Sequence, residues 1–343
     1  MNLIELHILQ SFPVSCLNRD DVGSPKTAVF GGVTRARISS QCLKRAARTF
    51  ARDEYPEAQF QGVRSRRLLE PFLAAFKAEG LSDEAAATKT DEVRNALSKI
   101  DRKNEALVTT AVFLSPSEIS QIAKEVCKGT DAAKAVKKAE RLDAADIALF
   151  GRMIANDASL NVEAAAMFGH ALSTHESGND IDFYSAVDER KTPDEDDSGA
   201  GMIGTLEFNS ALYYRYSAIN LDLLSAPTHL GGMTREQRQA VLAAFLKSVI
   251  QAVPGARRAS MNAATLPGYV LGVAKERGQP VQLVNAFLKP SKANLEDARD
   301  AMKVHSENLK RVWNIETKAE CELSETGKTT LPEFVSSLTN YVL

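Results

Sequence analysis

A basic segment between residues 16 and 52 has the side chains and the spacing needed to hold phosphate groups. A polar loop leads into a predicted helix that opens with two serines and carries four polar or basic residues at three- or four-residue spacing: Gln41, Lys44, Arg48 and Arg52. Residues spaced in this way lie near one line on a helix. One helical turn advances about 5.4 Å, which suits successive phosphates of an extended strand. The unpaired amides and the serine hydroxyls at the helix start would add a further anion site.

The positive charge is concentrated in this part of the chain. Residues 19–67 hold eleven Lys or Arg against five Asp or Glu, whereas the whole chain has a net charge of −2. A local excess of this kind is expected of a nucleic-acid footprint. Gly31 and Gly32, just upstream of the helix, permit close approach of the backbone to a ligand. The alternative is a solvated basic helix face, the usual meaning of a charge run. The local excess, the glycines and the serines together favour nucleic-acid binding.

The elements around this segment predict an α+β fold. The predicted strands lie at 3–11, 161–175, 205–220 and 262–275, and the predicted helices at 39–54, from the capping box Thr234–Gln237 onward, at 293–312 and at 331–342. The region 59–149, rich in Ala, Lys, Glu and Arg, predicts a helical insertion with helices around 64–79, 82–99 and 117–142. Without it the order is strand, helix, strand, strand, helix, strand, which is that of a ferredoxin-like or RRM-like unit. The predicted helix at 39–54 also carries a core-facing apolar stripe: Leu43, Ala46, Ala47, Phe50 and Ala51.

The overall composition is that of an ordinary globular protein. The 343 residues are 44% hydrophobic and 25% charged, and no apolar run approaches the about 18 residues of a membrane span. The first ten residues are typical of an alternating strand with Glu5 inside it, not of a signal peptide. Four scattered cysteines without a C-x-x-C pair indicate reduced thiols. A cytoplasmic protein with no membrane partner is therefore predicted.

Two further motifs do not predict the sites that they resemble. A G-x-G-x-x-G occurs at Gly199, Gly201 and Gly204, but an acidic loop precedes it and a predicted strand follows. A dinucleotide site needs a strand before this motif and a helix after it. His170 and His175 are five residues apart, which fails the i, i+4 spacing of a helical metal site, and in a strand they face opposite sides. No metal and no cofactor are therefore predicted.

Several long segments carry a family resemblance: SCLNRDD, AVFGG, RARISSQCLKRAAR, DIALFGRM, HALSTH, DIDFYSAVD, LEFNSALYYRYSAINL and AVPGARR. Together they resemble the repeated backbone subunit (CasC type) of the type I-E Cascade, the CRISPR RNA-guided surveillance complex of bacteria and archaea. The resemblance runs in order from Leu3 to about residue 290. It implies a right-hand shape with an RRM-like palm formed by 1–58 and 150–343, helical fingers at 59–149 and a β-hairpin thumb at about 178–204.

The resemblance also implies roles for individual residues. The RNA phosphates and sugars are expected to contact six residues that match the family's motif: Arg19, Lys26, Ser39, Gln41, Lys44 and Arg48. An apolar set is expected to wedge between bases: Met153, Phe183, Tyr184 and Ile203. Without the resemblance, these four are core or hairpin-packing residues. A basic cluster in the fingers is expected to contact target DNA: Lys134, Lys137, Lys138 and Arg141. The alternative for this cluster is a solvated helix.

The predicted function is a non-catalytic scaffold that oligomerises along the guide segment of a CRISPR RNA. The implied partners are the CRISPR RNA, the target DNA strand paired to it, further copies of the chain head to tail, and other Cascade subunits of the CasA, CasB, CasD and CasE types. One alternative is a Mg²⁺-dependent endoribonuclease that uses Asp20 or Asp21, as in related type III complexes. A standalone RNA chaperone is a third hypothesis.

Overall fold

The computed structural model describes residues 1–154, 156–187 and 200–341. The helices are α1 (Ser40–Glu54), α2 (Leu69–Ala78), α3 (Asp83–Leu97), α4 (Pro116–Cys127), α5 (Ala132–Lys138), α6 (Ala145–Phe150), α7 (Leu221–Leu224), α8 (Arg235–Gln251), α9 (Leu295–Trp313) and α10 (Leu331–Thr339). The strands are β1 (Leu3–Ser15), β2 (Thr27–Phe30), β3 (Val33–Ile38), β4 (Val63–Ser65), β5 (Ile100–Asp101), β6 (Asn104–Val108), β7 (Val112–Leu114), β8 (Ala166–Phe168), β9 (Ala171–Ser173), β10 (Asp180–Val187), β11 (Ala200–Asn220), β12 (Tyr269–Lys275) and β13 (Ala319–Ser324). The predicted α+β class is confirmed.

The chain divides into two compact units. The first unit comprises Met1–Ala47, Phe168–Ala218 and Lys247–Leu338. The second comprises Arg48–Met167, Ile219–Leu246 and Thr339–Leu343. The predicted borders of palm, fingers and thumb are not tested by this division, and they stay predictions.

The main sheet has the order β13-β12-β1-β11-β9-β3-β2 within the described residues, and both β10 and β8 pair with β11. Its four central strands, β12-β1-β11-β9, are the fourth, first, third and second strands of the predicted strand-helix-strand-strand-helix-strand unit. β1 pairs antiparallel with β12, from Leu3 opposite Lys275 to Leu9 opposite Tyr269. The RRM-like character of this palm stays a prediction.

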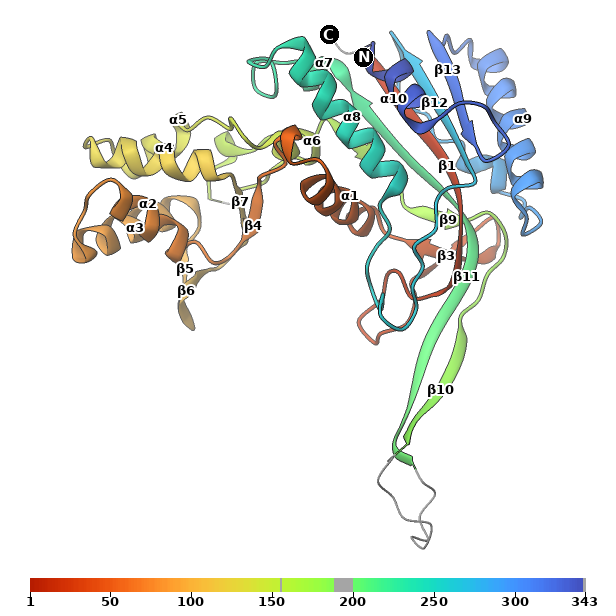
Figure 1. Ribbon diagram of the computed structural model, residues 1–343, viewed down its shortest axis with the longest axis horizontal. Helices are drawn as coiled ribbons and strands as arrows, with labels where there is room; N and C mark the ends of the chain where they lie inside the picture. The colour runs from red at the N-terminus through yellow and green to blue at the C-terminus, as the bar shows by residue number, and fades with distance from the viewer. Residues whose placement is uncertain (155, 188–199, 342–343) are drawn as a thin grey trace, which may run out of the picture. The chain divides into compact units, whose positions relative to one another are not determined.

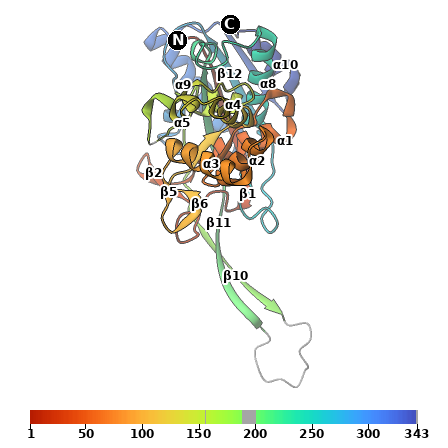
Figure 2. The same cartoon turned by 90° about the vertical axis from the view of Figure 1, so that its left-hand side faces the viewer.

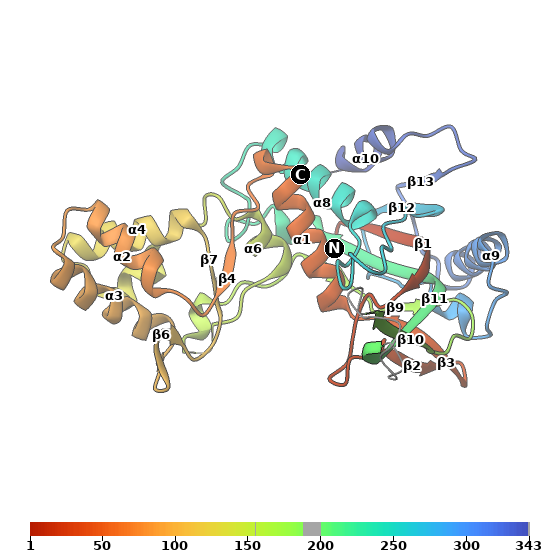
Figure 3. The same ribbon diagram turned by 60° about the horizontal axis from the view of Figure 1, so that its bottom comes forward.

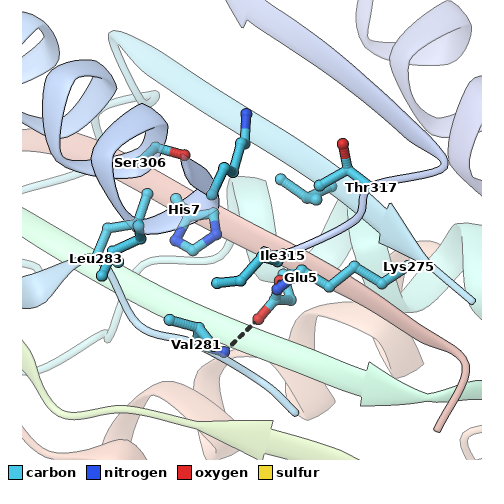
Figure 4. Close-up of a pocket in the computed structure, with 11 residues that line it drawn as sticks. Glu5, His7, Lys275, Val281, Leu283, Ser306, Ile315 and Thr317 are labelled. Carbon is cyan, nitrogen blue, oxygen red and sulfur yellow. Dashed lines mark hydrogen bonds and ion pairs between the residues drawn. The ribbon is translucent and has the colours of Figure 1, made fainter. Parts of the chain in front are cut away.

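Strand β1 differs from the predicted alternation because both of its faces are buried from Leu3 to Gln10. Helix α9 contacts this strand, so the polar residues of β1 lie in the interior. The Glu5 carboxylate forms a buried ion pair with Lys275 and accepts hydrogen bonds from the Tyr216 hydroxyl at 2.8 Å and the Val281 amide at 2.6 Å. Glu5 thus has its hydrogen-bond and charge partners within the protein. The cavity beside these groups measures only about 20 Å³ (Figure 4).

His7 belongs to the same buried region. The Tyr214 hydroxyl accepts the Leu283 N–H at 2.8 Å and lies 2.9 Å from His7 Nδ1. The hydroxyl and Nδ1 are within hydrogen-bonding distance, and which of them donates depends on the imidazole tautomer. Burial, and then the charges of Lys275 and Lys310, lower the pKa of His7 from 6.5 to about 3.

A His7→Gln variant is expected to lose part of the acid sensitivity of folding. The folded-state pKa of His7 is depressed, so its contribution to stability is complete above pH 6.5 and is lost as the pH falls toward 3. In this window the wild type loses up to about 1.4 kcal/mol of unfolding free energy per pH unit. Glutamine keeps a hydrogen-bonding partner for Tyr214 and does not titrate.

Urea unfolding of both proteins at pH 7.5, 5.5 and 4.5 measures this effect. The unfolding free energy of the wild type minus that of the variant should decrease as the pH falls. Taking this difference cancels the contributions of the other titrating groups. A difference that stays constant with pH would contradict the assignment of a neutral His7.

Strands β10 and β11 form a long antiparallel hairpin that leaves the sheet of the first unit, as Figures 1 and 2 show from two sides. The register runs from Asp180 opposite Phe208 to Val187 opposite Ala200, with an irregularity at Ala186. β11 thus begins at Ala200, five residues before the predicted strand, because the hairpin extends it beyond the sheet. The acidic loop that precedes Gly201 falls mainly on residues 188–199, which lie outside the described part of the chain.

The second unit contains a helical cluster in which α2 packs against α3 and α4 (Figure 3). Its apolar core includes Phe72, Phe76, Val93 and Ile122. The predicted helix at 117–142 is instead two helices, α4 and α5. Gly129 has a φ of +91°, which ends the first helix, and the Asp131 carboxylate accepts the Lys134 N–H at 3.2 Å and caps the second.

The predicted capping box is confirmed at the start of α8. The Thr234 hydroxyl accepts the Gln237 N–H at 3.3 Å, and the Gln237 side chain accepts the Thr234 N–H at 2.9 Å. The predicted helices at 293–312 and 331–342 correspond to α9 and α10. The predicted strand at 262–275 is shorter, since only Tyr269–Lys275 has a partner strand.

Candidate nucleic-acid interface

The polar loop after β1 is closed by its own side chains. The Asp20 carboxylate accepts the amides of Val22 at 3.0 Å and Ser24 at 2.9 Å. Such a turn fixes the backbone at the point where Arg19 forms an isolated bridge with Pro25. Asp20 therefore shapes the loop, and the exposed Arg19 lies beside the turn that it forms.

This loop is also fastened to the start of α1. The Asn18 carbonyl accepts the Lys26 N–H at 2.9 Å, and the Asn18 side-chain oxygen accepts the Ser39 N–H at 2.8 Å. The Ser39 hydroxyl in turn accepts the Cys42 N–H at 3.4 Å, the arrangement of a helix N-cap. Ser39 is only 6% exposed, so its observed role is to hold the helix start. Its predicted contact with RNA stays a prediction.

Helix α1 buries the predicted apolar line and leaves cations on another face. Leu43, Ala47 and Ala51 are buried, whereas Gln41 is exposed. Lys44 is half-buried with its Nζ 5.7 Å from the centre of the Phe168 ring, and burial lowers the pKa of its ammonium group. A cation held over an aromatic ring in this way is ordered while its outer side can still meet a phosphate.

Arg48 and Arg52 continue the same helix into the second unit. The Arg48 guanidinium lies 4.8 Å from the centre of the Phe113 ring. Arg52 instead donates to the carbonyls of Phe60 at 3.2 Å and Gly62 at 2.6 Å. The predicted line of cations available to a ligand therefore ends at Arg48, because the Arg52 guanidinium is bonded to these two backbone carbonyls.

Asp146 is a buried carboxyl that the sequence analysis did not single out. Its Oδ1 accepts the Gly62 N–H at 3.2 Å, and the charges of Arg48 and Arg52 act on it. Burial outweighs these charges and raises the pKa of Asp146 to about 6. Nothing in the sequence around position 146 indicates this arrangement, which depends on a loop that is more than eighty residues away.

Arg35 and Arg37, two residues apart in β3, have opposite roles. Arg35 is fully buried and donates to the carbonyls of Ser173 at 3.3 Å and Phe287 at 2.7 Å. Arg37, which is only partly buried, donates to the Thr27 carbonyl at 3.0 Å and lies 3.4 Å from His170 Nδ1. Residues two apart in a strand share a face, so the two arginines differ because Arg35 is covered by the segment whose Phe287 carbonyl it binds.

Arg37, His170 and Lys26 form a polar surface patch that sequence reasoning missed. Burial and the charges of Arg37 and Lys26 lower the pKa of His170. The patch brings a loop, a strand and the segment before β9 together, so only the folded chain reveals it. His175 has a structural contact, since its Nε2 accepts the Leu212 N–H at 3.2 Å.

The four predicted wedge residues differ in exposure. Met153 is 80% exposed and Phe183 is 74% exposed, which is unusual for large apolar side chains. Tyr184 packs across Gly204 of the opposite strand, where a Cβ would come within 2.5 Å of the tyrosine ring. Tyr184 thus packs the hairpin. The side chain of Ile203 lies outside the described residues, and its backbone pairs with Ser185.

The members of the predicted basic cluster, Lys134, Lys137, Lys138 and Arg141, differ in their contacts. Lys137 pairs with Asp157 at 2.9 Å, and Arg141 donates to the Thr228 carbonyl at 2.7 Å. Burial lowers the pKa of Arg141. Lys134 and Lys138 are exposed on α5. These two lysines are therefore the members of the cluster best placed to meet a nucleic acid.

No three or more His, Cys, Asp or Glu side chains in the described ranges come together as a set that could hold a metal ion. Within the same ranges no helix has the length and apolar character needed to cross a membrane.

The sequence profile of a Cas family described as "CT1975-like protein" matches residues 4–339. The chain belongs to this Cas family. Its fold is similar to that of a chain of a "CRISPR RNA-guided surveillance complex, pre-nicking", with a TM-score of 0.80, 26% identity and coverage of 99% of this chain and 100% of the other. A chain of another "CRISPR RNA-guided surveillance complex" has the same fold, with a TM-score of 0.71, 23% identity and coverage of 98% and 99%. No curated protein sequence matches significantly.

Proposed function

We propose that this CT1975-like protein is a non-catalytic backbone subunit, of the CasC type of type I-E Cascade, that binds CRISPR RNA in the cytoplasm. The observation that carries the proposal is the pair of ordered cations, Lys44 and Arg48, on one helix face of a chain that matches a surveillance-complex chain over its whole length. Arg19, Lys26 and Gln41 flank this pair at the loop and the helix start.

Cations of this kind read the phosphate backbone and not the bases. A subunit that serves any guide sequence needs this property, since target identity is then read by base pairing between guide and target DNA. The exposed Met153 and Phe183 supply apolar surfaces that can insert between bases. Unstacking costs a few kcal/mol per step and is offset by backbone contacts.

Several copies are proposed to line up head to tail along the guide. A heterologous contact that does not close into a ring generates a helical filament. Within the assembly, the CRISPR RNA, the target DNA strand and the other Cascade subunits of the CasA, CasB, CasD and CasE types are the proposed partners.

The test is the mass of the protein, by light scattering, after mixing with single-stranded guide RNAs of increasing length and Mg²⁺. We expect the mass to rise in steps with RNA length while a gel shows intact, protected RNA. A mass of one protomer per RNA at every length would contradict the scaffold proposal and favour an RNA chaperone.

The same gel tests the endoribonuclease alternative. That reaction would need Asp20 or Asp21 to bind Mg²⁺, and the Asp20 carboxylate already accepts two backbone amides. We expect no Mg²⁺-dependent cleavage of RNA paired to the guide. Cleavage that disappears in Asp20→Ala or Asp21→Ala would establish the enzyme instead.

Lys134→Gln/Lys138→Gln is expected to weaken nonspecific duplex DNA binding and to make the slope of log K against log salt shallower by about 1.8, because two phosphate contacts are lost. Assembly on RNA should be unchanged. Duplex binding is measured by fluorescence anisotropy, with Lys89→Gln/Lys128→Gln on α3 and after α4 as a control that removes the same charge. A variant that fails to assemble on RNA would contradict the assignment of this surface to DNA.

A further inference from the structure

Met153 is exposed although the residue just before it is buried. The Met153 side chain is 80% exposed, whereas the Arg152 side chain is 3% exposed. An apolar side chain that wedges between bases must keep its position when the bases push back. Met153, which is largely exposed, therefore depends on its neighbours in the chain for a fixed position.

Packing fixes only part of the segment that carries Met153. Ile154 and Leu160 lie in the apolar core of the second unit. On another side an open groove of about 280 Å³ is lined by Arg152 and by the segment Ser159–Val162, which pairs with it. Met153 is itself exposed and outside that core, so polar contacts of its neighbours help to fix its position.

Such contacts close the segment on both sides of Met153. Arg152 and Val162 exchange both backbone hydrogen bonds, at 2.9 and 2.8 Å. The Ile154 N–H donates to the Asn161 side-chain oxygen at 2.7 Å. The Arg152 Nε donates to the Leu160 carbonyl at 3.1 Å. The two residues that flank Met153 are thus both tied to the segment opposite.

One buried ion pair connects this closed segment to helix α4. Arg152 Nη1 lies 2.6 Å from Glu118 Oε1, and each side chain is 3% exposed. The other Glu118 oxygen accepts the Ser115 N–H at 3.0 Å in the capping box of α4. The carboxylate is therefore fixed by its own helix before it meets the guanidinium.

We propose that Arg152 and Glu118 are positioning residues for Met153 and set the geometry with which it splays the bases of bound RNA. This inference rests on the proposed function, because it requires that Met153 meets RNA. The guanidinium suits the task, since its rigid fork reaches Glu118, Leu160 and Phe113 together. A lysine keeps the charge and cannot make these contacts together.

The test uses guide RNAs that carry 2-aminopurine at successive positions, because this base fluoresces when it is unstacked. The assembled wild type should give a pattern of bright and dim positions. Met153→Ala should flatten the pattern. Arg152→Lys and Glu118→Gln should each lower the contrast between bright and dim positions at least twofold, while light scattering shows unchanged mass on the RNA. Glutamine preserves the capping box, so α4 keeps its start.

Lys128→Gln is the control, since it breaks an exposed pair with Glu125 on α4, the helix that carries Glu118. It should keep the full contrast. Full contrast in Arg152→Lys and Glu118→Gln, with loss only in Met153→Ala, would overturn the positioning role. Loss of assembly in both variants would show a general structural role and would overturn it as well. An unchanged pattern in Met153→Ala would instead refute the wedge itself, which belongs to the proposed function.

Discussion

Replacing Lys44 and Arg48 together by glutamine is expected to weaken assembly on guide RNA about 100-fold or more, since each charge-assisted hydrogen bond to phosphate contributes roughly 1.5–3 kcal/mol. Both cations are ordered before RNA arrives, because each lies over an aromatic ring, Phe168 or Phe113. Little side-chain entropy remains to be lost on binding. Glutamine keeps a polar side chain of comparable reach, so the helix should stay folded.

Binding isotherms at several salt concentrations measure this effect. Each phosphate contact on a single strand adds about 0.7 to the slope of log K against log salt, so the variant should be shallower by about 1.4. Lys89→Gln/Lys128→Gln removes two charges from surface ion pairs elsewhere and serves as the control. A weaker affinity with the wild-type salt slope would show that the two cations do not contact phosphates.

Much of the local structure could be predicted because its causes are local. The spacing of Leu43, Ala47 and Ala51 gives a buried line on α1, and the Thr234–Gln237 pair starts α8. The α+β class follows from the order of such elements. Helix α4 ends early because of Gly129, whose effect on a helix can also be recognised in sequence.

The candidate site was less accessible to prediction because its geometry is set by contacts between distant segments. Arg35 and Arg37 share one face of β3, and only the folded sheet shows which of them is buried. Arg52 looks equivalent to Arg48 in the sequence, and its use for two backbone carbonyls depends on a loop after α1. The family resemblance supplied the predicted roles of Met153 and Phe183, which the residues alone would have assigned to a core or to hairpin packing.

The buried ion pair between Glu5 and Lys275 in the sheet likewise depends on a contact between distant segments. Breaking this pair is the second change for which we expect a large effect. Lys275→Met is expected to destabilise the protein by about 3–5 kcal/mol, the usual cost of leaving one partner of a buried ion pair without the other. Glu5 would remain in a site where it is 1% exposed, with its charge no longer compensated. Urea unfolding at pH 7.5 measures the change.

Two further variants separate charge from packing. Lys318→Met, which breaks the exposed pair with Glu276, should leave the stability nearly unchanged, because water screens this pair. Glu5→Gln/Lys275→Met removes both buried charges and keeps a side-chain oxygen to accept from Tyr216 and Val281. It should therefore be more stable than Lys275→Met alone. If the double variant is as unstable as the single one, lost packing of the lysine stem, and not an uncompensated carboxylate, governs the stability of this sheet.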